Sequence, residues 1–250
     1  MKMRSYLLRL ALLALFSVSA LASLPGAGAQ TTVGSEQTPI DIRSEELTFV
    51  ERLPALGFSY SNKAALSVVN TGSPGEFNTV RAELPAGSNN TLTVACVTSR
   101  LLQFHWHTPS EHELNGQKFP VEMHLVHQAD DGTLTVVGVF VKSGKENKEL
   151  GKIFAALPAQ KDERRDIARF NLTKLLPHGL QSYRYMGSLT TPNPQGVFKE
   201  GVRWIVLAEP VEMSQQQIDA FKQLFPEGNS REVQPLNGRT VLTDVEPNDN

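Results

Sequence analysis

Histidine is the residue type whose spacing most clearly points to chemistry in this sequence. Five of the six histidines fall between positions 105 and 127 of the 250-residue chain. His105 and His107 lie two residues apart in the run Leu-Leu-Gln-Phe-His-Trp-His, which has the composition of a β-strand. Because side chains alternate along a strand, both imidazoles should point to one face while Phe104 and Trp106 point to the other.

His124 can join this pair from the next strand. The chain should turn near Asn115-Gly116, so that the run Val121–His127 returns beside the first strand. Three imidazoles that converge from rigid strands and leave a fourth position open are typical of a catalytic zinc site, whereas structural zinc sites usually include cysteine. The alternative is that an isolated His-x-His is only a pair of ordinary histidines.

Two polar neighbours favour the metal site. Gln103 shares the face of His105 and His107, and Glu122 shares the face of His124. Each can hydrogen-bond the far nitrogen of an imidazole and so fix its tautomer and orientation. A glutamate inside an apolar run would otherwise be costly to bury. The sequence therefore predicts zinc bound by His105, His107 and His124.

Strand signals dominate the elements that must position these residues. Short runs rich in β-branched and aromatic residues predict strands at 66–70, 91–97, 101–108, 121–127, 133–141 and 202–207. Asp131-Gly132 predicts a hairpin. Helices are expected at 147–156 and 214–224, the second with Ser214 and Gln217 as a capping box, and a short turn at 167–176. These elements predict a mainly β domain with short peripheral helices.

The beginning of the chain has the layout of a secretory signal peptide. A basic start and an apolar run precede the small residues 27–29, although a membrane anchor is the alternative. We expect residues 1–29 to be the signal peptide and residues 30–250 to form one domain, exported to the periplasm or secreted. Removing the three cations of the signal changes the formal net charge from −2 to −5, which argues against nucleic acid or membrane partners.

Cys96 is the only cysteine, so the chain cannot form an internal disulfide. It lies in the apolar run 91–97, and we expect a buried, unreactive thiol, with pairing between molecules as the alternative. Core packing must then supply the stability of the exported domain.

Taken together, the motifs resemble those of the α-class carbonic anhydrases. The run Gln103–His127 is similar to the metal-binding strand pair of that family, and Tyr183–Pro192 to its active-site threonine segment. Pro39–Ile42 and Gln234–Arg239 match motifs near the two ends, so the resemblance covers roughly residues 37 to 240. It implies a large, mostly antiparallel central sheet with short peripheral helices.

The resemblance also implies a reaction, the reversible hydration of carbon dioxide to bicarbonate and a proton by a zinc-bound hydroxide. Thr190 would accept the hydrogen bond of the hydroxide and donate its own proton to Glu111, which must stay ionised. An apolar wall would hold carbon dioxide beside the hydroxide, with one polar side formed by a threonine. The residues implied for this pocket are Val126, Val136, Leu189, Thr191, Val202 and Trp204.

Further roles follow from the same resemblance. The main-chain carbonyl of Asn229 would orient His107. Gln103 and Glu122 match the family's partners of His105 and His124. His112 and His127 match structural positions. The resemblance implies that inhibitory anions and sulfonamides bind, and it allows a homodimer.

Three departures from the family pattern bear on stability and catalysis. Only Gln30–Gln37 separates the expected cleavage site from the Pro39 motif, where members usually carry a longer segment that packs beside the cavity. The loop Pro192–Gly201 is longer than usual and lacks the cysteine that many bacterial relatives pair with that segment. We expect lower stability, since losing such a bridge typically costs about 2–5 kcal/mol. No histidine stands at the expected proton-relay position, residues 73–76, so we expect proton release to limit turnover.

Two other functions stay open. A catalytically weak or silent binding protein of the same family would typically lack a histidine ligand, and this chain keeps all three. A zinc hydrolase of esters or peptides would be indicated by a His-Glu-x-x-His helix, which the sequence does not contain.

Overall fold

The computed structural model describes residues 34–72 and 78–246, all within the compact unit Val33–Asn250. The expected signal peptide and the expected relay position at 73–76 lie outside the described residues. Among these residues, no helix combines the length and the apolar character needed to span a bilayer.

Strands account for most of the described elements, as the sequence predicts. They are β1 (Asp41–Ile42), β2 (Leu47–Phe49), β3 (Gly57–Ser59), β4 (Ala64–Asn70), β5 (Val80–Glu83), β6 (Thr91–Val94), β7 (Val97–His107), β8 (Glu113–Leu114), β9 (Val121–Ala129), β10 (Leu134–Ser143), β11 (Arg164–Phe170), β12 (Ser182–Ser188), β13 (Glu200–Met213) and β14 (Val241–Thr243). The helices are α1 (Lys148–Phe154) and α2 (Gln215–Leu224), with short 3-10 turns at Ser44–Glu46 and Leu172–Leu175.

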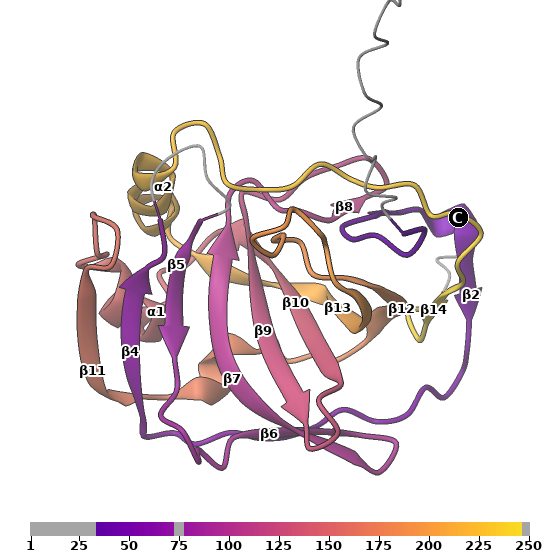
Figure 1. Ribbon diagram of the computed structural model, residues 1–250, viewed down its shortest axis with the longest axis horizontal. Helices are drawn as coiled ribbons and strands as arrows, with labels where there is room; N and C mark the ends of the chain where they lie inside the picture. Colours follow the sequence, from indigo (N-terminus) through magenta and orange to yellow (C-terminus); the bar gives the residue numbers. More distant parts are fainter. Residues whose placement is uncertain (1–33, 73–77, 247–250) are drawn as a thin grey trace, which may run out of the picture. The chain divides into compact units, whose positions relative to one another are not determined.

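Twelve of the described strands form one sheet, in the order β11-β4-β5-β7-β9-β10-β13-β12-β14-β2, with β6 pairing with β7 and β3 with β6 (Figure 1). Most neighbours are antiparallel, and the exceptions in this sheet are β10 with β13 and β14 with β2. Strands β1 and β8 form a separate parallel pair. The expected mainly β fold with a mostly antiparallel sheet is confirmed.

Both predicted helices are present and capped. The Ser214 hydroxyl accepts from the Gln217 amide, and the Gln217 side chain accepts from the Ser214 amide, so the predicted capping box of α2 is confirmed. The Asn147 side chain caps α1 by accepting from the amides of Glu149 and Leu150. These bonds satisfy donors that the first turn of a helix leaves free.

The prediction of one strand at 91–97 was wrong, and so was the burial of its cysteine. Strand β6 ends at Val94 and β7 begins at Val97, and these two residues pair directly. Between them Ala95 and Cys96 have φ angles of 46° and 69°, the left-handed pair that closes a two-residue hairpin. Cys96 is therefore exposed at a turn. The apolar composition concealed this turn because the turn contains no glycine or asparagine.

The segment 167–176, where a short turn was expected, contains the end of strand β11 and then a 3-10 turn. Strand β11 continues to Phe170 against β4, and a 3-10 turn follows at Leu172–Leu175, capped by the Asn171 side chain. Its buried Leu172 and Leu175 anchor this segment to the core. The Asp131-Gly132 hairpin between β9 and β10 is confirmed, with Gly132 at φ 85°.

The described residues contain two apolar clusters, and the strands β9, β10 and β13 contribute to both. The first includes Phe104 and Trp106 from β7 with residues of both helices. The second includes Val126, Val136 and Trp204 with residues near the chain start, such as Ile40. Along β9 every residue except Gln128 is buried, so any charged group on this strand needs a partner.

Candidate metal centre and active site

The three predicted ligands come together on adjacent strands. His105 in β7 pairs directly with His124 in β9, and His107 lies two residues further along the same face of β7. The ring centroids are 5.0 Å apart for His105 and His107, 5.3 Å for His105 and His124, and 4.7 Å for His107 and His124. One nitrogen from each ring lies within 4.8 Å of the others, so a single ion can contact all three.

Each imidazole uses its other nitrogen in a hydrogen bond. Nδ1 of His105 lies 2.8 Å from Gln103 Oε1, Nδ1 of His107 lies 2.9 Å from the Asn229 carbonyl, and Nε2 of His124 lies 2.9 Å from Glu122 Oε1. Since all three partners are acceptors, the bonding pattern assigns the proton to these nitrogens. The opposite nitrogens keep their lone pairs, and buried His107 Nε2 has no hydrogen-bond partner. These donors fit a tetrahedral zinc ion with one position left for solvent.

Burial sets the charge of the first two ligands. It lowers the pKa of His105 well below its usual value, with the neighbouring His107 and His124 adding to the effect, and it also lowers the pKa of His107. Both rings are therefore neutral near pH 7, which is the state that binds metal. Burial also lowers the affinity of His124 for a proton, but ionised Glu122 outweighs it and raises the pKa of His124.

Glu122 is fully buried, and both of its oxygens have hydrogen-bond partners. Its Oε2 accepts from the His112 amide at 2.8 Å, and its Oε1 lies 2.7 Å from His112 Nδ1 as well as near His124. Burial alone would raise the pKa of Glu122, but the charges and bonds of His112 and His124 hold it well below the usual value. The second group of potential ligands, His112, Glu122 and His124, is thus already bonded within itself.

Gly138 makes room for this carboxylate, and the sequence analysis missed it. It lies directly opposite His124 in β10, and a Cβ at Gly138 would lie 2.9 Å from Glu122 Oε1. An isolated glycine inside a strand pattern often marks a close approach of this kind, so the signal was present in the sequence. Tyr185 was also missed as a site residue, although its hydroxyl lies 2.7 Å from His112 Nε2.

Glu111 lies beside the histidines. Its Oε1 is 3.4 Å from His107 Nδ1 and accepts from the Arg231 amide at 2.9 Å, and its Oε2 is 3.8 Å from His124 Nδ1. Oε2 is buried without a hydrogen-bond partner. The expected bond from Thr190 is therefore not formed at Oε2, and this oxygen can still accept one. Thr190 itself is buried and lies two residues after the end of β12.

The expected apolar wall is a contiguous part of the second cluster. Val126, Val136, Val202 and Trp204 are buried together, and Leu189 packs against them while Thr191 is partly exposed. The Trp204 ring lies 4.9 Å from that of His124, between centroids. The Trp204 indole N–H donates to the Ser188 carbonyl at 2.9 Å, which ties the wall to the strand that leads into Leu189 and Thr190. These apolar side chains therefore lie beside one of the predicted ligands.

Comparisons with known proteins agree with this arrangement. The profile of the eukaryotic-type carbonic anhydrase family matches residues 26–245. The chain belongs to this family. A carbonic anhydrase of Pectobacterium carotovorum is 36% identical over 210 residues, which cover 84% of this chain and 80% of that protein. Human carbonic anhydrase 7 is 33% identical over 83% of this chain and 88% of its own length.

Solved structures give the same result. The α-carbonic anhydrase of Thermovibrio ammonificans, in complex with the inhibitor sulfanilamide, matches with a TM-score of 0.74 and 41% identity, over 84% of this chain and 87% of that one. The α-carbonic anhydrase of Photobacterium profundum matches with a TM-score of 0.72 and 39% identity, over 84% and 89% of the two chains. The protein is an enzyme of the carbonic anhydrase class.

Within this carbonic anhydrase fold, the long loop Pro192–Gly201 contacts the start of the described chain. Glu200 Oε1 accepts from the Glu36 amide and the Gln37 side chain, both at 2.8 Å. Arg231 also holds Gln37, at 2.9 Å, and its guanidinium lies 3.4 Å above the centre of the Phe198 ring. The loop Pro192–Gly201, which departs from the family pattern, thus contacts Arg231, and the amide of Arg231 donates to Glu111.

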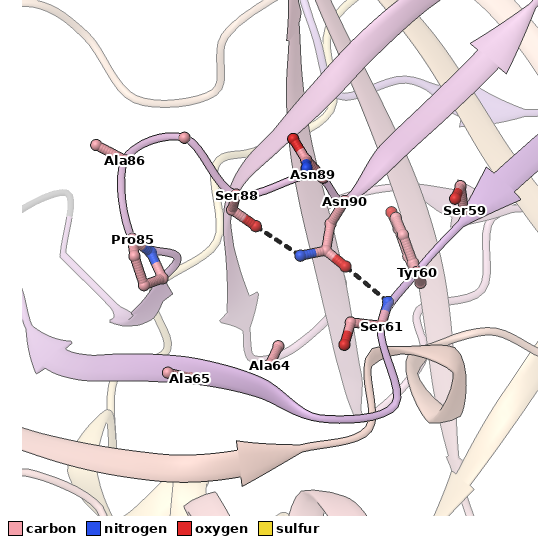
Figure 2. Close-up of a pocket in the computed structure, with 11 residues that line it drawn as sticks. Ser59, Tyr60, Ser61, Ala64, Ala65, Pro85, Ala86, Ser88, Asn89 and Asn90 are labelled. Carbon is pink, nitrogen blue, oxygen red and sulfur yellow. Dashed lines mark hydrogen bonds between the residues drawn. The ribbon is translucent and has the colours of Figure 1, made fainter.

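A further pocket lies between β3, β4 and the segment before β6. Several polar groups that line it hydrogen-bond one another. Figure 2 shows the Asn90 side chain between two neighbours: its amide donates to the Ser88 hydroxyl, and its oxygen accepts from the Ser61 amide. Tyr60 also lines this pocket, and its hydroxyl lies 2.6 Å from His127 Nε2. His112 and His127 both have buried partners of this kind, in keeping with the structural roles expected for them.

Proposed function

We propose that this enzyme hydrates carbon dioxide reversibly to bicarbonate and a proton, with zinc bound by His105, His107 and His124. One observation carries the proposal: each of the three imidazoles hydrogen-bonds an acceptor through one nitrogen and turns the other nitrogen toward a common point. Ordinary buried histidines would satisfy both nitrogens, as His112 does with Glu122 and Tyr185.

The chemistry of the bound metal is that of a Lewis acid. Zinc in a site with three histidines lowers the pKa of a water molecule that it binds to about 7, and carbonic anhydrase is the standard example of this effect. The chain's own task is to keep the ligands neutral and fixed. Gln103, Glu122 and the Asn229 carbonyl do so by accepting one N–H from each ring.

We assign Thr190 and Glu111 to the orientation of the reacting hydroxyl. Glu111 has one oxygen occupied by the Arg231 amide and one without a partner, so it can accept the Thr190 hydroxyl proton. A threonine hydroxyl that donates its only proton to a carboxylate can make further hydrogen bonds only as an acceptor. It therefore favours a molecule that has a hydrogen to donate, such as a hydroxide. Val126, Val136, Leu189, Thr191, Val202 and Trp204 would then line the place of carbon dioxide.

Three finer expectations belong to the same proposal. The chain is exported, with residues 1–29 as signal peptide, to the periplasm or out of the cell. Inhibitory anions and sulfonamides bind at the histidine site, as supported by the sulfanilamide complex of the Thermovibrio ammonificans relative. A homodimer is compatible with the proposal and is tested by light scattering.

Metal analysis of three variants tests the ligand set. His105 belongs only to the first group of potential ligands and His112 only to the second. We expect one zinc per chain in the wild type, loss of zinc in His105→Gln, and retention in His112→Gln. His178→Gln is the matched control, since His178 is exposed and lies outside both groups. Zinc retained by His105→Gln and lost by His112→Gln would contradict the assignment, and a zinc-loaded wild type without hydration activity would favour the silent binding protein.

A further inference from the structure

Arg81 lies on the wall of the site next to the first ligand. In the register of β5 and β7, Arg81 is directly opposite His105 and Glu83 is directly opposite Gln103. Directly paired residues of an antiparallel pair share one face of the sheet. Arg81 and Glu83 therefore lie on the histidine side, and the Arg81 charge is close enough to contribute to the lowered pKa of His105.

Arg81 shares an ionised carboxylate with a second arginine. Arg81 Nε donates to Glu83 Oε1 at 3.1 Å, and Arg164 Nη1 donates to Glu83 Oε2 at 2.8 Å. Burial favours the neutral form of Glu83, but the bonds to the two arginines outweigh it and lower the pKa of Glu83, so the carboxylate stays ionised. Two guanidinium groups share this single carboxylate, and Arg164 has Asp162 and Asp166 as further acidic neighbours, so Glu83 does not belong to Arg81 alone.

We propose that Arg81 makes this wall an anion-binding position that strengthens the binding of bicarbonate and small carboxylates in the active site. The inference rests on the proposed function, because bicarbonate is an occupant of the site only if the enzyme interconverts it with carbon dioxide. Carbon dioxide is neutral and gains little from a nearby cation. Bicarbonate carries one negative charge on a planar group of oxygens, the shape that guanidinium groups recognise.

The geometry of Arg81 leaves part of its side chain for such a ligand. Its bonds to Glu83 use Nε and Nη2, and not Nη1. The side chain is 38% exposed, so it is reachable from solvent but is also screened by water and salt. For a single charge in this setting, we expect a gain in anion affinity of roughly three- to tenfold at low ionic strength.

The test is an equilibrium titration rather than a rate. The overall equilibrium fixes the ratio of kcat/KM in the two directions, so kinetics alone cannot isolate bicarbonate binding. Bicarbonate and acetate are titrated against the cobalt-substituted protein, followed by its visible absorption, at low and high ionic strength. We expect Arg81→Gln to raise both dissociation constants roughly three- to tenfold at low salt and less at high salt. Arg81→Lys keeps the charge but not the planar guanidinium, so it should lose less affinity than Arg81→Gln.

Arg100→Gln is the matched control, because Arg100 is an exposed arginine of β7 that pairs with Asp130 near the β9–β10 hairpin. Equal dissociation constants for the wild type and Arg81→Gln at low salt would overturn the inference, as would an equal loss in Arg100→Gln. These outcomes leave the proposed function standing if the wild type still binds bicarbonate. A wild type that binds cobalt but neither anion would overturn both.

Discussion

His127 makes the stability of this enzyme depend on pH in a way that can be calculated. The ring is fully buried, with Nε2 at 2.6 Å from the Tyr60 hydroxyl and Nδ1 at 3.3 Å from the Thr135 carbonyl. Burial raises the pKa of Tyr60 well above its usual value, so this hydroxyl keeps its proton and donates it to Nε2. Burial also lowers the pKa of His127 to about 4 from 6.5, and the folded protein therefore holds a neutral ring.

The sign follows from proton counting. Between pH 4 and pH 6.5 the unfolded chain binds a proton at His127 that the folded chain does not, so the free energy of unfolding falls as the pH falls through this window. The contribution lost between pH 7 and pH 5 is about 2 kcal/mol, and below pH 4 the loss levels off near about 3 kcal/mol. Above pH 7 the contribution of His127 no longer changes.

Urea unfolding at pH 7 and pH 5, followed by tryptophan fluorescence, measures this loss. Zinc-free protein is used, so that pH-dependent metal binding does not add to the change. His127→Gln keeps an acceptor for Tyr60 but does not titrate, and it should lose about 2 kcal/mol less than the wild type between the two pH values. His178→Gln, which removes an exposed histidine, should follow the wild type. The reasoning is refuted if His127→Gln and the wild type lose the same free energy.

Three further outcomes are expected. Glu122→Gln should weaken zinc binding by roughly 10- to 100-fold in a chelator competition, since it loses the charge that orients His124; unchanged affinity would remove Glu122 from the account. Gly187→Ala should lower the free energy of unfolding by about 1–3 kcal/mol, because the new Cβ would collide with the Thr38 hydroxyl. Gly57→Ala is the control and should be nearly neutral, since no neighbouring atom would lie closer than 3.5 Å to its Cβ. Imidazole buffer should raise kcat for carbon dioxide hydration without changing kcat/KM, and indifference to the buffer would refute the idea that proton release limits turnover.

Much of the site was predictable because it lies on two regular strands. Strand periodicity alone places His105 and His107 on one face, and a hairpin return brings His124 to them, which is the arrangement found. Gln103 and Glu122 could be assigned for the same reason, since each lies two residues from a ligand on the same strand.

Contacts between distant parts of the chain could not be read from periodicity. The carbonyl of Asn229 reaches His107 across 122 positions, and only the family resemblance indicated it. Arg81 was missed because its register against His105 depends on how β5 pairs with β7, which no local pattern specifies. The turn at Cys96 was missed because apolar residues adopt the left-handed conformation there.

The most direct test of the account is the rate of carbon dioxide hydration, measured by stopped flow at pH 8 on one preparation in three states. The account predicts activity in the zinc-loaded protein, loss of activity after removal of zinc with a chelator, and recovery when one equivalent of zinc is returned. Activity that is unchanged by zinc removal, or a zinc-loaded protein that does not accelerate hydration, would contradict it.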